Sequence, residues 1–142
     1  MKTIRQLLKV KGNDVWAVEP ADSVFEAITM MAEKGIGALL VMQGSETVGV
    51  VSERDYARKV ILQGRSSKDT SVREIMTPDV VFAGPDNTIE KCMALMTDKR
   101  IRHLPIREEQ TVIGVVSIGD LVKAIISNQR FKIEQLEKYV SG

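Results

Sequence analysis

A short motif that reads as the end of a strand occurs twice in this chain, and it limits the possible folds more than any other feature. The sequence Gly-Val-Val-Ser-x-x-Asp stands at residues 49–55 and again at residues 114–120. The likeness extends beyond the motif, because residues 14–61 align with residues 79–126 at a constant offset of 65 without a gap. A match of this length predicts a duplicated fold unit with two equivalent sites, one at the end of each strand.

Each half of the chain has the pattern strand, helix, strand, strand, helix. Capping residues, apolar spacing and turn residues predict these elements in the first half: a helical turn at 4–8, a strand at 15–18, a helix from Ser23 to Gly35, strands at 38–42 and 47–52, and a helix at 55–63. The second half restarts with a capped turn at 72–76 and a strand at 80–83. One half of about 60 residues is marginal for independent folding, so we expect the halves to pack together. The predicted fold class is α/β (α+β), with two pseudo-symmetric β-α-β-β-α repeats packed as one module.

The repeat and one polar stretch divide the chain into four parts. We predict a first repeat with an N-terminal lead-in at 1–64, a linker at 65–70, a second repeat at 71–128 and a C-terminal helical tail at 129–142. The tail places Ile133, Leu136 and Val140 on one helical face among charged residues. This face favours docking of the tail on its own domain, and the alternative is a contact with a second subunit.

The composition excludes several classes of function. With 20 basic and 19 acidic residues the net charge is +1, so nothing global draws the chain to nucleic acid or to an anionic membrane. No apolar run approaches the roughly 20 residues that span a bilayer, and the N-terminus has no signal-peptide pattern. A single cysteine and a single histidine allow neither an internal disulfide nor a Cys/His zinc site. We therefore expect a cytoplasmic protein without a metal site.

The repeated motif combines two chemical preferences. A strand that ends beside a helix start leaves free backbone amides next to Ser52 and Ser117, and such amides bind anions or phosphate. The ionised side chains of Asp55 and Asp120 accept two hydrogen bonds at once, which suits a vicinal diol such as the ribose 2′,3′-hydroxyl pair. By physical chemistry alone, Ser-x-x-Asp is equally an ordinary helix N-cap.

The two halves, the repeated motif and the segment Ile-Arg-His-Leu-Pro-Ile at 101–106 resemble a tandem cystathionine-β-synthase (CBS) domain pair, also called a Bateman module. The resemblance covers about residues 3–127, and residues 52–60 and 64–68 are most similar to the small stand-alone bacterial members. In that family the cleft between the repeats holds adenosine-containing ligands: AMP, ADP, ATP, NAD(H) or S-adenosylmethionine. The members assemble as flat homodimers, so the resemblance implies a homodimer here.

The resemblance also assigns roles to the residues of the repeated motif. It implies that Asp55 and Asp120 hold ribose hydroxyls, one in each repeat. It implies further that Ser52 and Ser117 lie beside ribose or phosphate.

The same resemblance assigns the base and the phosphate to other residues. Thr77 and Val81 match the adenine wall of the family. Arg102 and His103 match positions from which several members contact phosphate, and Arg54 is a second candidate. The alternatives are an ordinary core or edge histidine at His103 and a solvated helix face for the basic residues around Arg54.

The two implied sites are not equivalent. The first repeat has Gly37 and Ala38 where the second has Arg102 and His103, so the first repeat lacks the basic pair. We therefore expect one strong site and one weak or empty site, and the sequence leaves open which of them is strong.

These features predict a non-catalytic regulatory module that binds an adenosine nucleotide or dinucleotide and signals to a partner protein, whose identity the sequence does not reveal. The alternative is a structural dimerisation scaffold that has no nucleotide ligand. An enzyme is disfavoured because no nucleophile and base pair and no metal cluster stands out. DNA binding is disfavoured because no recognition-helix pattern is present.

Overall fold

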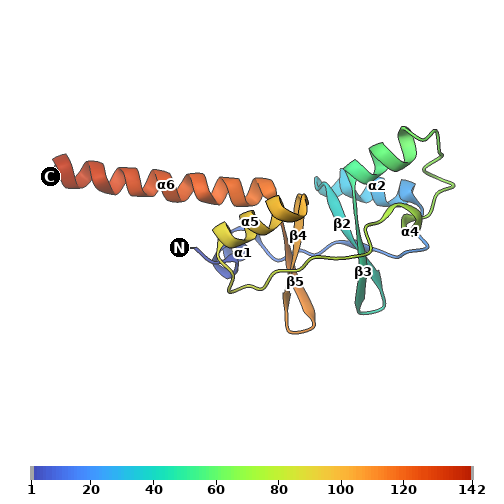
Figure 1. Ribbon diagram of the computed structural model, residues 1–142, viewed down its shortest axis with the longest axis horizontal. Coiled ribbons are helices and arrows are strands. Elements are labelled where there is room, and N and C mark those ends of the chain that lie inside the picture. The colour runs from blue at the N-terminus through green and yellow to red at the C-terminus, as the bar shows by residue number, and fades with distance from the viewer. Residues whose placement is uncertain (1, 142) are drawn as a thin grey trace. The chain divides into compact units, whose positions relative to one another are not determined.

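The computed structural model describes residues 2–141 and the side chains of residues 2–138, so the side chain of Val140 in the predicted tail lies outside the described range (Figure 1). The helices are α1 (Ile4–Lys11), α2 (Val24–Lys34), α3 (Glu53–Tyr56) with its π-helical continuation η1 (Ala57–Ile61), α4 (Val72–Ile75), α5 (Ile89–Lys99) and α6 (Ile118–Ser141). The strands are β1 (Ala17–Val18), β2 (Ala38–Gln43), β3 (Glu46–Ser52), β4 (His103–Glu108) and β5 (Thr111–Ser117). This mixture of helices and small sheets confirms the predicted α/β class.

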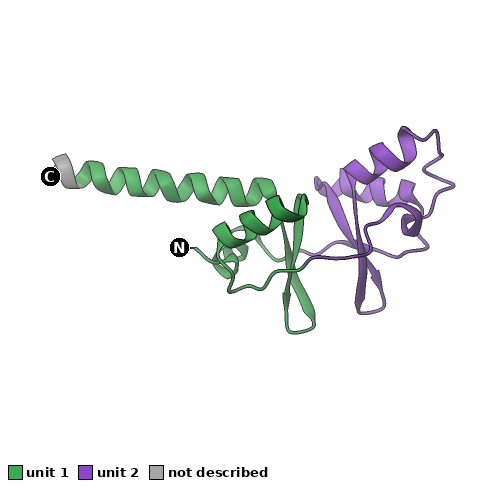
Figure 2. Ribbon diagram, viewed as in Figure 1, with its two compact units in different colours: residues 1–14, 82–142 green, residues 15–81 purple. Residues whose placement is uncertain are grey.

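The chain divides into two compact units, and the division does not follow the linear order of the repeats (Figure 2). Unit 1 comprises residues 1–14 and 82–142, and unit 2 comprises residues 15–81. The lead-in helix α1 therefore belongs to the unit that is built mainly from the second repeat. Helix α4, which opens the second repeat in the sequence, belongs to the unit of the first. The domain boundaries drawn from the sequence remain predictions about the linear chain.

Unit 2 contains a three-stranded sheet in the order β1-β2-β3. Strand β1 is parallel to β2, and β2 is antiparallel to β3 with Ala38 opposite Ser52. The helices of this unit bury their apolar faces in a core that also takes side chains from all three strands: Val18, Val24, Ala27, Met31, Leu39, Val41, Val51, Val60, Val72 and Ile75. Helix α4 contributes the last two side chains of this core, which explains why it belongs to unit 2.

Unit 1 contains a two-stranded antiparallel sheet, β4-β5, in which His103 lies opposite Ser117. The predicted strand at 80–83 is wrong, because only Ala83 pairs with β4, through an isolated parallel bridge to Ile106. The amide of Val80 instead donates to the carbonyl of Pro78 at 3.1 Å, which turns the chain locally. The proline at position 85, which has no N–H, ends any extension of the pairing on the other side.

The predicted helix starts are confirmed at three positions. Thr3 and Gln6 form a reciprocal capping box in which each side chain accepts the backbone amide of the other residue, at 3.3 and 2.9 Å. Ser71 and Glu74 form the second box, and the Ser23 hydroxyl caps α2. Gly35 ends α2 with a φ of 65°, a left-handed conformation that favours glycine.

The glycine that opens each repeated motif permits a close approach of another element. A Cβ atom at Gly114 would lie 2.8 Å from a methyl carbon of Leu8, so α1 packs directly onto β5 at this point. A Cβ atom at Gly49 would lie 2.6 Å from the sulfur of Met76 and 3.0 Å from the carbonyl oxygen of Thr77. Glycine at this position of the motif therefore makes room for a neighbouring segment in each unit. In unit 1 this segment is α1, and in unit 2 it is residues 76–77.

Helix α6 runs from the end of β5 through the predicted start of the tail without a break, and it extends beyond the other elements of unit 1 (Figure 1). The side chains of Ile133 and Leu136 are 54% and 64% exposed. The prediction that the tail docks on its own domain is therefore wrong. Its apolar face is uncovered within the described chain.

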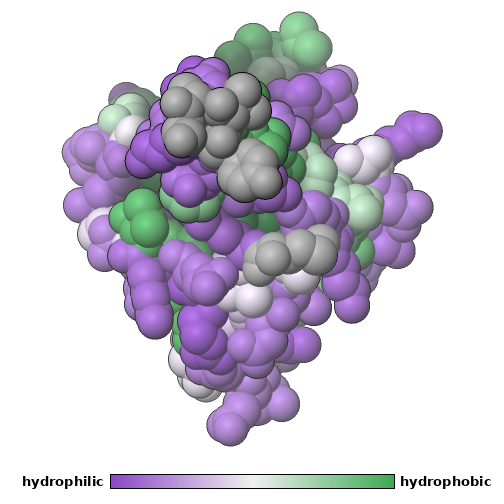
Figure 3. Space-filling view, turned by 90° about the vertical axis from the view of Figure 1, so that its left-hand side faces the viewer, coloured by the Kyte–Doolittle hydropathy of each residue, from purple (hydrophilic) through white to green (hydrophobic). Residues whose placement is uncertain are grey.

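Much of the molecular face shown in Figure 3 is hydrophilic, with apolar side chains between the hydrophilic ones. Among residues 2–141, no helix combines the length and the apolar character needed to cross a bilayer.

Candidate functional site

In unit 2 the repeated motif forms a tight network at the junction of β3 and α3. The backbone amide and the hydroxyl of Ser52 donate to Oδ2 of Asp55 at 2.9 and 3.1 Å, and the amide of Asp55 donates to the Ser52 hydroxyl oxygen at 3.2 Å. The ammonium of Lys59 lies 3.1 Å from the other carboxylate oxygen, Oδ1, and also donates to the carbonyl of Ile75. The Asp55 side chain is only 14% exposed.

In unit 1 the second copy of the motif builds the same junction between β5 and α6. The amide of Ser117 donates to Oδ2 of Asp120 at 2.8 Å, and the amide of Asp120 donates to the Ser117 hydroxyl oxygen at 3.1 Å. Here the cation is Lys11, from the end of α1, whose ammonium lies 2.6 Å from the same Oδ2 atom and also donates to the carbonyl of Val115. The Asp120 side chain is 27% exposed.

In both units the serine and the aspartate therefore form the helix capping box that the motif permits by itself, with the serine as N-cap residue and the aspartate three residues later. In each unit the carboxylate also carries an ion pair, and the cation comes from a different place in the chain. Lys59 lies one helical turn after Asp55, whereas Lys11 is far from Asp120 in sequence and reaches it only through the packing of α1 onto β5. The sequence predicts a helical turn only at 4–8, whereas α1 extends to Lys11, so no local pattern pointed to Lys11 as a site residue.

The register of the strand pairs shows which residues lie next to the serine in each unit. In unit 1, His103 lies opposite Ser117, and the carbonyl of Arg102 accepts the amide of Ile118 at 2.8 Å. In unit 2 the equivalent positions are Ala38 opposite Ser52 and Gly37, and neither carries a cation. Unit 1 therefore has Lys11, Arg102 and His103 near its serine and aspartate. In unit 2, Lys59 forms the ion pair with Asp55, and the positions equivalent to Arg102 and His103 carry no charge.

The groups in unit 1 influence one another electrostatically. Burial lowers the pKa of His103 below its ordinary value of 6.5, the positive charges of Lys11 and Arg102 lower it further, and Asp120 opposes them. Burial raises the pKa of Asp120, but hydrogen bonds from Lys11 and Ser117 outweigh it and bring the pKa below 3.8. At neutral pH the site therefore holds a carboxylate, two fixed cations and a neutral imidazole.

The remaining predicted ligand residues lie in unit 2. Thr77 is exposed and exchanges two backbone hydrogen bonds with Val50, two residues before Ser52 in β3. Val81 is half-buried at the end of this unit, and Arg54 lies in the first turn of α3. Their predicted contacts with the base and the phosphate stay predictions.

The basic cluster around Arg54 is largely engaged in local contacts. Besides Lys59, Arg65 forms an ion pair with Glu74, and Lys68 lies over the ring of Phe25. Arg65 and Lys68 lie beyond the end of η1, so the predicted helix face does not include them, and the role of the cluster stays a prediction.

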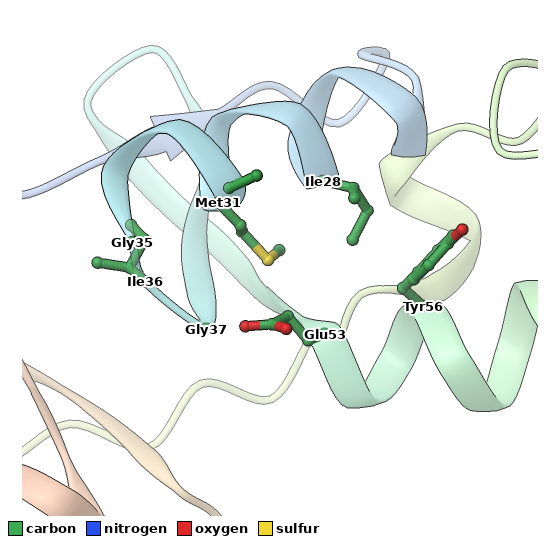
Figure 4. A pocket seen from close by; sticks show the side chains of 8 residues that line it. Ile28, Met31, Gly35, Ile36, Gly37, Glu53 and Tyr56 are labelled. Atoms are coloured by element: carbon green, nitrogen blue, oxygen red, sulfur yellow. The ribbon is translucent and has the colours of Figure 1, made fainter.

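A pocket of about 380 Å³ lies between α2 and α3 in unit 2 (Figure 4). Its lining is mainly apolar, with side chains of Ile28 and Met31 on one side and Glu53 and Tyr56 on the other. None of the predicted ligand residues lines it. The pocket adjoins the Ser52-Asp55 junction, because Glu53 follows Ser52 directly in the motif, but neither Ser52 nor Asp55 lines it.

Comparisons with known proteins agree with this organisation. The family model for the CBS domain matches the chain twice, at residues 9–61 and 72–127. The CBS domain-containing protein CBSX3, mitochondrial, from Arabidopsis thaliana is 39% identical over 99% of this chain and 72% of its own length. The solved structure of a CBS-domain protein from Burkholderia ambifaria is 52% identical, with a TM-score of 0.86 over 90% of this chain and 96% of that one.

A more distant structure shares the fold. The CBS domain pair of protein MJ0100, solved in complex with 5′-methylthioadenosine and S-adenosyl-L-methionine, is 20% identical, with a TM-score of 0.80 over 90% of this chain and 98% of that chain.

The duplicated α/β fold with one Ser-x-x-Asp junction in each unit defines a tandem regulatory module. The chain belongs to the CBS domain family, of which it contains a domain pair.

Proposed function

We propose that this CBS pair is a non-catalytic sensor of an adenosine-containing ligand and that its main binding site is the Ser117-Asp120 junction of unit 1. The observation that carries the proposal is the ion pair of Lys11 with Asp120 beside His103, which lies opposite Ser117 and is influenced by the charges of Lys11, Arg102 and Asp120. A carboxylate next to several cations suits a ligand that has both a sugar diol and phosphate groups. The complex of the MJ0100 domain pair with two adenosine compounds supports this class of ligand.

The chemistry of binding follows from the hydrogen bonds of Asp120. Its Oδ2 atom already accepts from Ser117 and Lys11, so a ribose diol binds through Oδ1, the oxygen that neither of them uses, or replaces Lys11. Replacement would release the ammonium of Lys11 to bind phosphate together with Arg102. A nucleotide therefore gains more from this site than a nucleoside does.

The Ser52-Asp55 junction of unit 2 is the weaker site in this proposal. Asp55 is less exposed than Asp120 and is held by Lys59 from its own helix. The neighbouring positions Gly37 and Ala38 supply no charge for phosphate. We expect this junction mainly to cap α3 and to bind ligand more weakly than the Ser117-Asp120 junction.

Signalling in this proposal begins at α1. Lys11 is the last residue of α1, so a ligand that takes its place on Asp120 removes the ion pair that holds this end of the helix. A partner protein that prefers one of the two states of α1 would then read ligand occupancy. AMP, ADP, ATP and NAD(H) are the candidate ligands that carry phosphate, and S-adenosylmethionine carries only the diol.

We extend the proposal to a cytoplasmic homodimer that acts on a separate regulated protein. Large apolar side chains exposed on the helices of unit 2 and the turn that follows them support self-association: Phe25, Ile61 and Leu62 are 46%, 54% and 74% exposed. Burial of such side chains in an interface is favourable.

The test compares two matched substitutions, Asp120→Asn and Asp55→Asn. Each retains the shape of its helix cap and removes one negative charge, so the two variants differ mainly in the unit that they alter. Binding of AMP, ADP, ATP, NAD, NADH and S-adenosylmethionine is measured by calorimetry and by thermal shift. A ligand at 100 times its dissociation constant stabilises the wild type by about 2.7 kcal/mol. Asp120→Asn should weaken its binding about tenfold to a hundredfold, and Asp55→Asn should weaken it less.

Two results would contradict this assignment. A larger effect of Asp55→Asn would move the main site to unit 2. Failure of all six compounds to bind the folded wild type would favour the alternative function, a dimerisation scaffold without a nucleotide ligand.

A further inference from the structure

The second half of α6 is an exposed helix. Within the described chain, every side chain from Gln129 to Lys138 is exposed, and Ile133 and Leu136 are more than half exposed. A helix segment of about a dozen residues is marginal in water when nothing packs against it. This segment therefore gains stability from any partner that covers its apolar side chains.

The apolar positions of α6 have the spacing of a coiled coil. Ile126, Gln129, Ile133 and Leu136 follow one another at intervals of three, four and three residues, and we name these four residues the α6 seam. Val140 continues the spacing in the sequence. Intervals that alternate between three and four residues keep one face of two supercoiled helices in contact. Ile126 is 44% exposed, so the seam is open from its first residue.

The residue types of the α6 seam favour a second copy of the same helix as the partner. If Ile126 and Ile133 occupy the a positions of a heptad, Gln129 and Leu136 occupy the d positions. Branched isoleucine at a and leucine at d favour two parallel strands. A single polar seam residue such as Gln129 favours one register, because any other register would place its amide against apolar side chains.

The charges beside the α6 seam also favour the parallel arrangement. In a parallel pair the g residue of one helix faces the following e residue of the other, which brings Lys132 to Glu137 of the second copy on both sides of the seam. An antiparallel pair in which the same seam residues meet would instead bring Lys132 towards Lys132 and Arg130 towards Arg130. Like charges at these positions oppose association.

We propose that the α6 seam forms a parallel, in-register two-stranded coiled coil with the α6 seam of a second copy of this chain. This contact involves only residues of α6, so it does not depend on nucleotide binding. It is also separate from any contact through the exposed helices of unit 2.

Cysteine crosslinking of the full chain tests the register directly. The native Cys92 is 1% exposed, so the wild type serves as a background without reactive thiol. Leu136→Cys and Gln129→Cys each place one thiol in the seam, and Lys138→Cys places one thiol on the opposite side of the helix. Under mild oxidation the two seam variants should form disulfide-linked dimers at concentrations at which Lys138→Cys remains uncrosslinked.

A charge exchange tests the flanking pair. Lys132→Glu should weaken self-association about tenfold, because it places two carboxylates together on each side of the seam. The double variant Lys132→Glu with Glu137→Lys should restore self-association. The dissociation constant is measured by sedimentation, and the thermal unfolding of each variant shows that the two units remain folded.

Three results would overturn the proposal. Equal crosslinking of Leu136→Cys and Lys138→Cys would show that the seam is not the contact. Self-crosslinking of neither seam variant would exclude an in-register parallel pair. Failure of the double charge exchange to restore association would exclude the Lys132 to Glu137 contact.

Discussion

The carboxylate of Asp120 takes part in two interactions through the same oxygen atom. It caps the start of α6 through Ser117, and it holds the end of α1 through Lys11. A ligand that binds to the carboxylate can keep the first contact and replace the second, because the cap is local and the ion pair joins two segments of the chain. In the proposed function, Lys11 therefore couples ligand binding to the packing of α1 in unit 1.

Replacing Lys11 should change ligand preference rather than abolish binding. In Lys11→Met the methionine keeps the apolar stem and loses the ammonium. Adenosine should bind as well as before or better, because Asp120 no longer has a competing cation. ATP should lose about one order of magnitude of its advantage over adenosine, since a charge-assisted contact to phosphate is missing. Calorimetry with both compounds measures the ratio.

Lys9→Met is the matched control for this prediction, since Lys9 is an exposed lysine of the same helix. An equal weakening of ATP and adenosine binding in Lys11→Met would show that Lys11 only positions Asp120.

His103 should make the stability of the chain depend on pH in a defined direction. Because its pKa is lowered in the folded state, the unfolded chain binds a proton first when the pH falls below the ordinary value of 6.5. The free energy of unfolding should therefore decrease as the pH falls from about 7 towards the folded pKa, and His103 should contribute nothing to this slope at higher pH.

Urea unfolding of the wild type and of His103→Gln at several pH values measures this contribution. The variant should have a flatter profile over that range, because His103 is the only histidine in the chain. A parallel pair of profiles would mean that another group causes the decrease.

The packing of α1 onto β5 depends on a single small residue, Gly114. Leu8 lies against Gly114 and is only 4% exposed, so it cannot move into solvent to make room for a larger residue. Lys11 follows Leu8 by one turn of the same helix, which means that this contact also sets the position of the cation. The glycine of the second repeated motif thus serves the site through packing.

Gly114→Ala should therefore destabilise the chain by about 1–3 kcal/mol, as overpacking of a buried contact does. The double variant Leu8→Ala with Gly114→Ala should lose less than the sum of the two single variants, because the shortened side chain leaves room for the new methyl group. Gly119→Ala is the control, since its added Cβ atom would meet only the Ser117 hydroxyl at an ordinary 3.6 Å. Urea unfolding gives the free energies of unfolding of the wild type and of the four variants, and additive losses would contradict the direct contact.

For the molecule as a whole, the exposed end of α6 should be separable from the two units. A chain that ends at residue 128 loses only side chains that are exposed in the described structure. It should unfold at nearly the same temperature as the full chain and keep its response to ligand, while it loses association through the α6 seam. Circular dichroism and thermal shift measure the first two properties, and sedimentation measures the third. A large fall in the unfolding temperature of a dilute sample would show that this end of α6 supports unit 1.

Much of the fold follows from patterns between near neighbours. The capping boxes at Thr3 and Ser71, the left-handed glycine at Gly35 and the hairpin after Ala38 depend on residues a few positions apart, and each formed as predicted. The two hairpins have the same register at positions 65 residues apart, and both have a shift at equivalent places. Local geometry was sufficient for these features because short segments have few ways to satisfy their backbone groups.

Only the tertiary structure decided which distant segments meet. The exchange of α1 and α4 between the units, the single bridge at Ala83 in place of a strand, and the ion pair of Lys11 with Asp120 all join parts of the chain that no local pattern connects. The sequence by itself determined the duplicated elements and the two aspartates, because these depend on spacing. The tertiary structure decided that Lys11 joins Asp120 in unit 1, since the position of Lys11 depends on a buried contact between Leu8 and Gly114 that is visible only in three dimensions.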